Sequence, residues 1–421
     1  MGRNRRRVGD AVNRRVVVTG VGAVTPLGVG ARTLHEGWLA RRSGIEDGTG
    51  ACSDFDPTDV MSVKEVRRSD RFAQLAIAAC AEAIADAGWD PTEPPCESDM
   101  VGCVIGTGIG GMGSFEHSCD VLRERGPGRV SPLSIPLIMG NAASGLLAMR
   151  HGLRGPVFGV MSACASGTHA LGTALRMIQC GDADAVIAGG AEATLTPLSR
   201  AAFSAMEATS PTGVSRPFDA RRDGFVMGEA AGVLVLESAE LAAARGANVL
   251  GEILGYAATA DAHHLTAPDP AGTRAALAIT RAISNAGLQP SDIDYVNAHG
   301  TSTPLNDRSE TGALKLALGE YALRVPVSST KSAIGHSLGA AGAVEAIATI
   351  LALTDRVAPP TLGYEEQEED LDLDYVPDGP RPLRLRQNGS GPKPSVAISN
   401  SFGFGGHNAV LCLGGAPGLG H

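Results

Sequence analysis

Residues 158–178 read FGVMSACASGTHALGTALRMI, an apolar run followed by a segment built largely from Ala, Gly, Ser and Thr. This pattern predicts a strand, a turn and a helix, with Cys164 in the turn. A sulfur at that position faces the first backbone N–H groups of the helix, which favour a thiolate. A single cysteine in apolar surroundings is more often part of the core, so the stretch alone leaves a structural thiol and a nucleophile both open.

Composition and charge exclude several classes of protein. The chain has 421 residues, 43% of them hydrophobic, a formal charge of −10 and eight cysteines without CxxC spacing. An acidic chain disfavours nonspecific nucleic-acid binding, and no stretch is judged long and apolar enough to span a bilayer. The cysteine pattern fits reduced thiols. We therefore expect a cytoplasmic protein with neither nucleic acid nor membrane as partner.

The order of apolar and Ala-rich segments predicts an α/β protein made of two similar halves. Strand-like runs alternate with helical stretches, and a second series of the same kind begins at Gly251. This divides the chain into a basic tail over residues 1–14, an N-terminal half over 15–250 and a C-terminal half over 251–421. With 55 glycines and 4% aromatic residues, the core has to be packed through closely approaching backbones. The acidic segment 358–382 contains Leu and Tyr, which predict an ordered surface loop.

Two glycine-rich turns are candidates for a nucleotide site. Residues 19–28, TGVGAVTPLG, have Thr25 where the GxGxxG pattern needs its third glycine, and Pro26 is unfavourable in the helix that should follow. Residues 108–113, GIGGMG, satisfy the pattern after a strand, but no clear ribose-binding acid follows. Neither turn therefore predicts a nucleotide site.

Polar residues suited to catalysis gather behind predicted strands: His299, Thr301, Thr303, Lys331, His336 and Glu345. Residues 400–408, NSFGFGGHN, form a glycine-punctuated turn that can bring backbone amides close to a ligand. A lone histidine is more often structural than catalytic. Layered α/β proteins, however, assemble their sites at strand ends, so these sets together indicate one site.

The motifs around these residues resemble those of the β-ketoacyl-[acyl-carrier-protein] synthases of the condensing-enzyme, thiolase-like superfamily, and within them the chain-elongating synthase II type. The resemblance runs from about Arg15 to Leu413 and is carried by VVVTGVGAVTPLG, GLRGP, SACASG, GDADAVIAGGAEA, SRPFDARRDGFVMGEAAGVLVLE, NAHGTSTPLND, STKSAIGH and SFGFGG. It implies a thiolase-like, five-layered αβαβα fold made of two related halves. It also implies an acyltransferase that condenses acyl-[acyl carrier protein] with malonyl-[acyl carrier protein], releases CO2 and extends acyl chains by two carbons in fatty acid biosynthesis.

The resemblance further implies a catalytic role for five side chains. Cys164 would carry the acyl chain. His299 and His336 would donate hydrogen bonds to the malonyl thioester oxygen as enolate charge grows. Lys331, with Glu345 as its partner, would hold the histidines in their working protonation state.

Binding roles follow from the same resemblance. The backbone amides of Phe404 and of the nucleophile would form the oxyanion hole, with the Phe404 ring as a gate. Thr301 and Thr303 would bind the pantetheine arm. Ile109 and Phe203 would line the acyl pocket, where a stiff, β-branched Ile limits the depth open to the chain.

The resemblance implies partners but no cofactor or metal, because phosphopantetheine is carried by the substrate acyl carrier protein. Lys64, Arg67 and Arg68 stand at helical spacing and would form a basic face that docks this acidic carrier. The family is homodimeric, and residues 131–145, SPLSIPLIMGNAASG, would supply the apolar interface.

Alternatives remain open within and outside the enzymes. A second His at position 336 disfavours the synthase III and chalcone-synthase branches, and no second catalytic cysteine points to a thiolase. A ketosynthase of a type II polyketide pathway has the same chemistry, and a noncatalytic carrier-protein-binding subunit has the same fold but lacks the cysteine at position 164. His407 and residues 204–213 depart from the usual motifs, so the sequence defines the mechanism more closely than the acyl substrate.

Overall fold

The computed structural model describes residues 14–384, 387–388, 391–392 and 394–416. The predicted basic tail lies outside these residues, apart from Arg14. Arg14 forms an ion pair with Asp184, with 2.6 Å between Nη2 and Oδ1. Arg14 therefore belongs to the folded body and not to a frayed tail.

The N-terminal half contributes five main strands to a mixed sheet. Their order is β4–β3–β5–β6–β1, and a short strand, β2, pairs with β1. Strand β3 is parallel to β4 and β5, whereas β6 is antiparallel to β5 and β1. The strands are β1 (Val16–Thr25), β2 (Gly28–Val29), β3 (Val101–Gly106), β4 (Val157–Val160), β5 (Ala185–Glu192) and β6 (Ala230–Ser238).

The C-terminal half repeats this arrangement. Its order is β9–β8–β14–β15–β7, with β8 parallel to β9 and β14, and β15 antiparallel to β14 and β7. The strands are β7 (Gly251–Ala260), β8 (Tyr295–Asn297), β9 (Val327–Ser328), β14 (Val396–Gly403) and β15 (His407–Gly415). Antiparallel pairing of β1 with β7 joins the two halves into one 11-stranded sheet.

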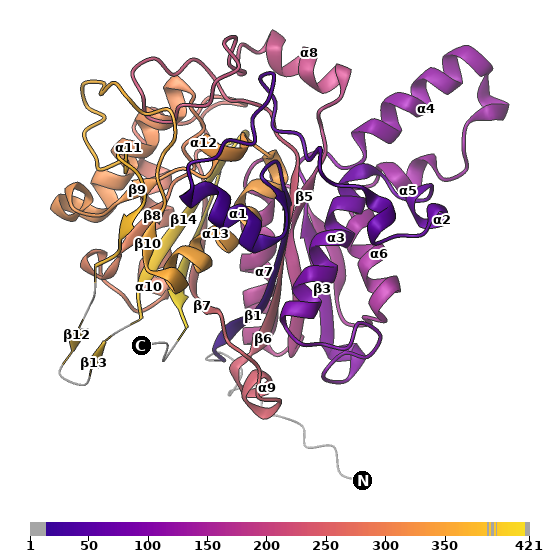
Figure 1. The fold of residues 1–421 in the computed structure, drawn as a ribbon, viewed down its shortest axis with the longest axis horizontal. Helices are drawn as coiled ribbons and strands as arrows, with labels where there is room; N and C mark the ends of the chain where they lie inside the picture. The colour runs from indigo at the N-terminus through magenta and orange to yellow at the C-terminus, as the bar shows by residue number, and fades with distance from the viewer. Residues whose placement is uncertain (1–13, 385–386, 389–390, 393, 417–421) are drawn as a thin grey trace.

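Helices fill the space between the two halves of the sheet and cover its outer faces. Helices α7 (Ser166–Cys180) and α13 (Ala341–Asp355) pack on each other and on strands of both halves. Helix α3 (Arg71–Asp86) covers the outer face of the N-terminal half, and α10 (Thr273–Asn285) covers that of the C-terminal half. Figure 1 shows α3 and α10 on opposite sides of the molecule with α7 and α13 between them. The thiolase-like five-layered αβαβα fold is thus confirmed.

The remaining elements decorate these layers. The other helices are α1 (Ala31–Leu39), α2 (Val63–Val66), α4 (Met112–Arg125), α5 (Ser134–Ile138), α6 (Ala142–His151), α8 (Pro197–Ala205), α9 (Ala239–Ala244), α11 (Pro304–Leu318) and α12 (Lys331–Ile334). Two short pairs are formed by β10 (Val357–Ala358) with β11 (Arg381–Pro382) and by β12 (Gln387–Asn388) with β13 (Gly391–Pro392).

Close backbone contacts at the centre explain the abundance of glycine. A Cβ on Gly167 would lie 2.8 Å from the amide nitrogen of Ala343, and one on Gly172 would lie 2.4 Å from the ring of Tyr256. Both distances are shorter than a van der Waals contact. Helix α7 therefore approaches α13 and the C-terminal sheet closely because Gly167 and Gly172 carry no side chain at these two contacts.

The segment Leu338–Asp355 corrects one prediction. With a mean hydropathy of 1.5 it is long and apolar enough to cross a membrane, although the sequence was judged to hold no such stretch. It is, however, 89% buried inside the protein, as expected for a central helix packed by sheet on both sides. The ordered loop predicted for residues 358–382 is confirmed, because Leu371, Leu373 and Tyr375 anchor it in the core.

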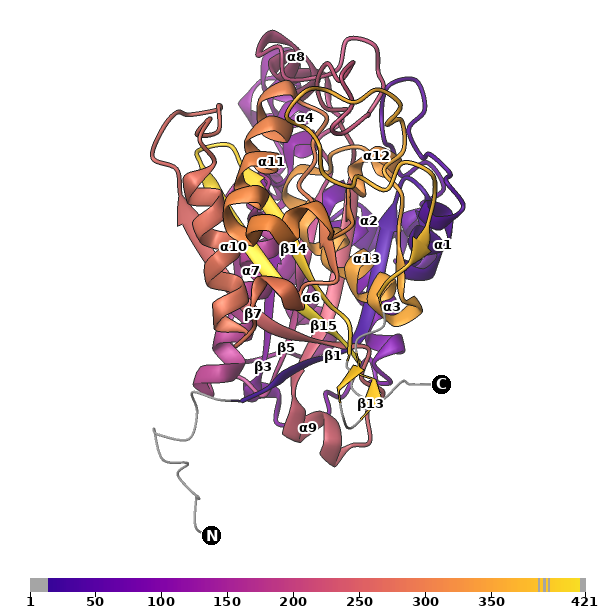
Figure 2. The same cartoon turned by 90° about the vertical axis from the view of Figure 1, so that its left-hand side faces the viewer.

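The topology gathers strand ends at one pole of the sandwich. Figure 2 shows α8 and α9 at opposite ends of the molecule. Strands β3, β4 and β5 are parallel, and β5 leads into α8, so the carboxyl ends of all three face the α8 end. The segments after β4, β8, β9 and β14 carry Cys164, His299, His336 and Phe404, and all four line one cavity.

Candidate active site

Cys164 lies in a tight turn between β4 and α7. Ala163 precedes it with φ of 49°, in the left-handed region that residues other than glycine adopt only at a cost. Ser166 holds this turn, because its Oγ donates to the Ala163 carbonyl at 2.7 Å and accepts from the Ser162 amide at 2.9 Å. The turn presents Cys164, 6% exposed, just before the first residue of α7.

His336 contacts the thiol directly. Its Nε2 lies 3.0 Å from Cys164 Sγ. Its Nδ1 accepts a hydrogen bond from the Leu338 amide at 3.3 Å, so the ring proton is assigned to Nε2 and faces the sulfur. The His336 amide donates to the Val226 carbonyl at 2.7 Å, which fixes the backbone beneath the ring.

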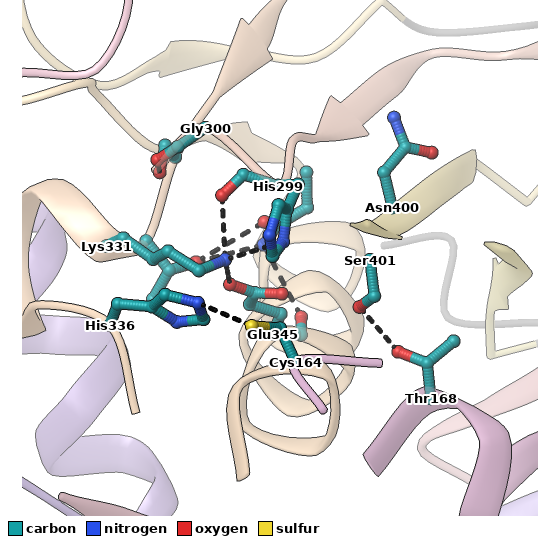
Figure 3. Close-up of polar contacts among 12 residues, drawn as sticks. Cys164, Thr168, His299, Gly300, Lys331, His336, Glu345, Asn400 and Ser401 are labelled. Carbon is teal, nitrogen blue, oxygen red and sulfur yellow. Dashed lines mark hydrogen bonds and ion pairs between the residues drawn. The ribbon is translucent and has the colours of Figure 1, made fainter. Parts of the chain in front are cut away.

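Lys331 connects the second histidine to a buried carboxylate, as Figure 3 shows. Lys331 Nζ lies 3.2 Å from His299 Nδ1 and 2.7 Å from the His299 carbonyl oxygen, and it forms an ion pair with Glu345. Because Nδ1 of His299 accepts from Lys331, the ring proton is on Nε2. The rings of His299 and His336 stand at 86° to each other with centroids 5.4 Å apart.

Burial determines the protonation states of these groups. It lowers the pKa of His299 and His336 well below the ordinary histidine value, and the charge of Lys331 lowers both further. Both rings are therefore neutral at pH 7 and can donate a hydrogen bond without carrying charge.

Burial also acts on the nucleophile. It raises the pKa of Cys164 to about 11, although Lys331 and the backbone amides of Phe404 and Cys164 lower it. The sequence indicated that the helix terminus favours a thiolate. In the structure desolvation outweighs the nearby dipoles, so the free thiol is protonated at pH 7.

A cavity of about 310 Å³ lies beside the thiol. Predicted site residues in its walls are Cys164, Phe203, His299, Thr301, Thr303, His336 and Phe404. The hydroxyl oxygens of Thr301 and Thr303 are 2.8 Å apart, and the Phe203 and Phe404 rings are 6.5 Å apart. Lys331 and Glu345 lie behind the histidines and touch the cavity only through them.

Ile109 and Phe203 both pack beside the nucleophile. They contact a small apolar cluster formed by Cys164, Phe225, Met227 and Leu338. The Phe203 ring stands edge-on to Phe225 at 5.4 Å, and Phe225 stands edge-on to His336 at 5.3 Å. The structure thus places both predicted pocket residues within the apolar surroundings of the thiol.

The basic residues predicted to dock a carrier lie away from this cavity. Lys64, Arg67 and Arg68 are exposed, but the prediction that they share one helical face was wrong, because α2 ends at Val66. After Val66 the amides of Arg68 and Ser69 donate to the carbonyls three residues back, those of Glu65 and Val66, at 2.9 and 3.4 Å, so the chain continues as a tighter turn and not as an α-helix.

Two models of known protein families match the chain. Models described as "Beta-ketoacyl synthase, N-terminal domain" and "Beta-ketoacyl synthase, C-terminal domain" match residues 13–242 and 250–365. The chain belongs to the β-ketoacyl synthase family. The synthase is 46% identical over 417 residues to the 3-oxoacyl-[acyl-carrier-protein] synthase 2 of Synechocystis sp., an alignment that covers 95% of this chain and 98% of the relative.

Solved structures resemble the synthase over most of its length. A β-ketoacyl synthase from Burkholderia phymatum is 33% identical with a TM-score of 0.87, covering 96% of this chain and all of the other. A type II polyketide ketosynthase, solved with its acyl-carrier protein and bound to the hexaketide, is 31% identical with a TM-score of 0.86 and the same coverage.

Sequence reasoning missed two buried carboxylates of the synthase, Glu310 and Glu192. Glu310, on α11, accepts from the amides of His299 and Gly300 at 2.8 and 2.7 Å and from Asn400 Nδ2 at 3.1 Å. It fixes the turn that carries His299. An acidic residue at an inward position of a helix is the signal that would have found it.

Among the residues that the structure describes, the candidates for metal ligands are Cys164, His299 and His336. The ligand atoms of Cys164, His299 and His336 lie within 4.8 Å of one another. An ion held by all three would bind the sulfur to which the motif resemblance assigns the acyl chain. Resident metal and acyl transfer therefore exclude each other at this site.

Proposed function

We propose that the synthase extends acyl chains by two carbons through the decarboxylative condensation of acyl-[acyl carrier protein] with malonyl-[acyl carrier protein], in fatty acid biosynthesis. The observation that carries this proposal is the 3.0 Å contact between Cys164 Sγ and His336 Nε2 at the wall of the cavity. The 46% identity to a 3-oxoacyl-[acyl-carrier-protein] synthase 2 supports the same reaction.

The first half-reaction transfers the acyl group to Cys164. The sulfur attacks the thioester carbonyl, the bond to the pantetheine sulfur breaks, and the Cys164 proton leaves on the released pantetheine thiol. The amides of Phe404 and Cys164, which act on the sulfur and lower its pKa, are the donors for the oxyanion. Lys331 adds a positive charge that favours the thiolate.

The second half-reaction uses the histidines. The Nε2–H groups of His299 and His336 donate to the malonyl thioester oxygen as the bond to CO2 breaks and enolate charge builds up there. The enolate carbon then attacks the Cys164 thioester, and the Cys164 sulfur leaves as a thiolate, which releases the 3-oxoacyl product and takes up a proton from water. Neutral rings suit this task, because their N–H groups donate hydrogen bonds and hold the proton more firmly than a charged imidazolium would.

Residues around the cavity bind the substrate and control its entry. Thr301 and Thr303 lie on the cavity side of the His299 turn, where their hydroxyl groups can bind the pantetheine arm. The Phe404 ring faces Phe203 and acts as the gate. Ile109 and Phe203 border the acyl chain. The pantetheine belongs to the substrate, so these residues need no cofactor of their own.

The carrier docks on the exposed cations Lys64, Arg67 and Arg68. Lys64 and Arg68 line a surface hollow of about 260 Å³ together with Arg150. Replacing the three predicted cations by Glu should raise the KM for acyl-carrier, and the effect should shrink with added salt. An unchanged KM at low salt would remove this surface from the proposal.

We further propose a homodimer in the cytoplasm. Strand β4 is an edge strand. Exposed apolar side chains lie on it, directly after it and on α5 and α6: Phe158, Met161, Ile135 and Met149, at 37%, 57%, 66% and 75% exposure. A soluble monomer rarely exposes such a patch. The eight free cysteines support a reducing compartment.

One assay separates the candidate functions. The synthase is incubated with malonyl-carrier and a series of acyl-carriers of increasing length, and both CO2 and 3-oxoacyl product are measured. Saturated acyl primers should be extended once by two carbons. Repeated extension without reduction would favour the type II polyketide ketosynthase, which the 31% identical neighbour represents. No CO2 release would leave a noncatalytic partner subunit, which the presence of Cys164 disfavours.

A further inference from the structure

Glu192 is a buried carboxylate for which the reaction steps give no task. It is the last residue of β5, and its side chain is 0% exposed. Among the residues that the structure describes, no Lys, Arg or His forms a salt bridge with it. A buried carboxylate without a counter-charge costs free energy unless hydrogen bonds satisfy its oxygens.

Hydrogen-bond donors from two separate turns satisfy Glu192. Oε1 accepts from Thr107 Oγ1 at 3.1 Å and from the Ile109 amide at 3.3 Å. Oε2 accepts from the Gly108 amide at 2.5 Å and from the Gly339 amide at 3.0 Å. Three donors belong to the turn after β3, residues 107–111, and the fourth belongs to the turn before α13, residues 336–340.

The two turns meet without space for side chains. A Cβ on Gly339 would lie 2.1 Å from the Gly108 nitrogen, and a Cβ on Gly108 would lie 2.7 Å from Glu192 Oε2. Glycine at both positions lets the backbones approach until one carboxylate reaches both. The contact between the two turns is therefore built around the carboxylate of Glu192.

Each turn carries a residue that the reaction uses. The first carries Ile109, which packs on the cluster that contains Cys164 and Leu338. The second carries His336, whose Nδ1 accepts from the Leu338 amide at 3.3 Å. A shift of either turn would move the acyl-pocket wall and the ring that contacts the thiol together.

We propose that Glu192 is a positioning residue that locks turn 107–111 to turn 336–340, so that acyl-chain selection and malonyl decarboxylation depend on one carboxylate. The inference rests on the proposed function, because it assigns Ile109 and His336 their roles there. Burial raises the pKa of Glu192 to about 7, while its four donors lower it, so the carboxylate is mostly ionised at pH 8.

The test is Glu192→Gln at pH 8, compared with Glu237→Gln. Glutamine keeps the volume but turns one acceptor into a donor that faces N–H groups. Glu237 is an equally buried carboxylate at the opposite end of the same strand pair, where it accepts from Thr19, Trp89 and Arg245. It controls for the loss of a buried carboxylate as such.

Glu192→Gln should lower kcat for malonyl decarboxylation by about tenfold per folded molecule and change the ratio of long-chain to short-chain acyl transfer by several-fold, since misplaced groups lose rate steeply. Glu237→Gln should lower stability and leave that ratio unchanged. Thr107→Val, which removes one donor, should shift the ratio in the same direction by less. The inference is overturned if Glu192→Gln lowers all rates equally, or if Glu237→Gln shifts the ratio as much.

A crystal structure of Glu192→Gln gives a readout independent of activity. Turns 107–111 and 336–340 should move apart in it, whereas unchanged turns would refute the positioning role. Failure of the wild-type synthase to release CO2 would instead refute the proposed function and leave the structural readout intact. If Glu192→Gln does not fold, Thr107→Val decides by the same ratio.

Discussion

The two halves of the synthase have the same strand order and directions but contribute different chemistry. The segment after β4 presents Cys164 before α7, and the topologically equivalent segment after β9 presents Lys331 and His336 before α13. The turn after β3 carries Ile109 and shapes a pocket, whereas the turn after β8 carries His299. One scaffold thus presents a thiol from one half and a lysine and two histidines from the other.

A buried carboxylate holds the turn after the same strand in each half. Glu192 accepts from the amides of Gly108 and Ile109 after β3, and Glu310 accepts from the amides of His299 and Gly300 after β8. The carboxylates come from different elements, β5 and α11. The halves therefore share a physical solution, a carboxylate binding backbone N–H groups, without sharing the residue that provides it.

The largest effect is expected when the thiol of Cys164, which the N-terminal half contributes, is removed. Cys164→Ala should reduce acylation and condensation by several orders of magnitude with an unchanged fold, because it removes the nucleophile and little volume. Mass spectrometry after incubation with acyl-carrier checks this. Cys180→Ala, at an exposed cysteine, is the matched control and should be fully acylated. Acyl groups found on Cys103 or Cys180 of the wild type would contradict the assignment.

The next largest effect is expected when one of the two histidines, which the C-terminal half contributes, is removed. His299→Ala or His336→Ala removes one donor to the malonyl oxygen, which should cost about 10²–10³-fold in decarboxylation rate. Acyl transfer to Cys164 should fall less, and less for His299→Ala than for His336→Ala, since only His336 touches the sulfur. The rates of acylation and of CO2 release are measured separately. Equal losses in both would contradict the assignment of acyl transfer to Cys164 and of decarboxylation to the histidines.

A third change tests the buried ion pair, which Glu345 has and Glu192 lacks. Lys331→Met leaves Glu345 buried without its partner and should lower the free energy of unfolding by about 3 kcal/mol. Lys331→Met with Glu345→Leu should recover most of that stability but none of the decarboxylation. Urea unfolding measures the first and CO2 release the second. If the single and double variants were equally stable, the stability lost in Lys331→Met would not come from leaving the Glu345 carboxylate without Lys331.

The fourth prediction compares the two buried carboxylates by pH. Burial raises the pKa of both Glu192 and Glu310 from 4.5 to about 7. A carboxyl with a higher pKa in the folded state stabilises that state fully below pH 4.5, and this contribution is lost as the pH rises to about 7. Each carboxyl should account for a loss of about 3 kcal/mol over that range.

Glu192→Gln and Glu310→Gln should each flatten the dependence of unfolding free energy on pH, by similar amounts. Denaturant unfolding across this pH range measures the slope. The double variant should show the sum of the two changes. If only one variant flattened this dependence, only one of the two carboxyls would have a raised pKa in the folded state, and the two halves would differ in this respect.

The smallest expected effect concerns the pocket wall. Ile109→Phe should reduce transfer of long acyl chains several-fold, spare short ones and leave malonyl decarboxylation nearly unchanged, because the larger ring shortens the space beside Cys164. A kinetic series over acyl-carriers of increasing length measures this. A uniform loss over the series would indicate damaged packing and return Ile109 to the core.

Motifs with local geometry were predictable from the sequence. The turn that presents Cys164 depends on its neighbours Ala163 and Ser166, and strand, turn and helix follow from one continuous stretch. The resemblance of whole motifs also identified the two histidines and Lys331. These features are local, because they depend on residues a few positions apart or on patterns that hold them together in any member of the family.

Long-range contacts were not predictable in the same way. Glu192 reaches Gly108 across 84 residues once β3 and β5 pair, and Glu310 reaches His299 across 11 residues once α11 folds back on the turn after β8. Lys64, Arg67 and Arg68 stand at helical spacing, but α2 ends at Val66 and the next amides bond to carbonyls three residues back. Helical spacing in a sequence does not show at which residue a helix ends.

The sequence by itself determined the two-half α/β fold and the position of Cys164 before a helix, because periodicity and turn chemistry act over short distances, while the motif resemblance supplied the roles expected of the polar residues. Only the tertiary structure decided the charge states. Burial raises the pKa of Cys164 and lowers those of His299 and His336, and burial is the sum of contacts from both halves. Desolvation depends on every atom that excludes water from a group, so it exists only once the chain is folded.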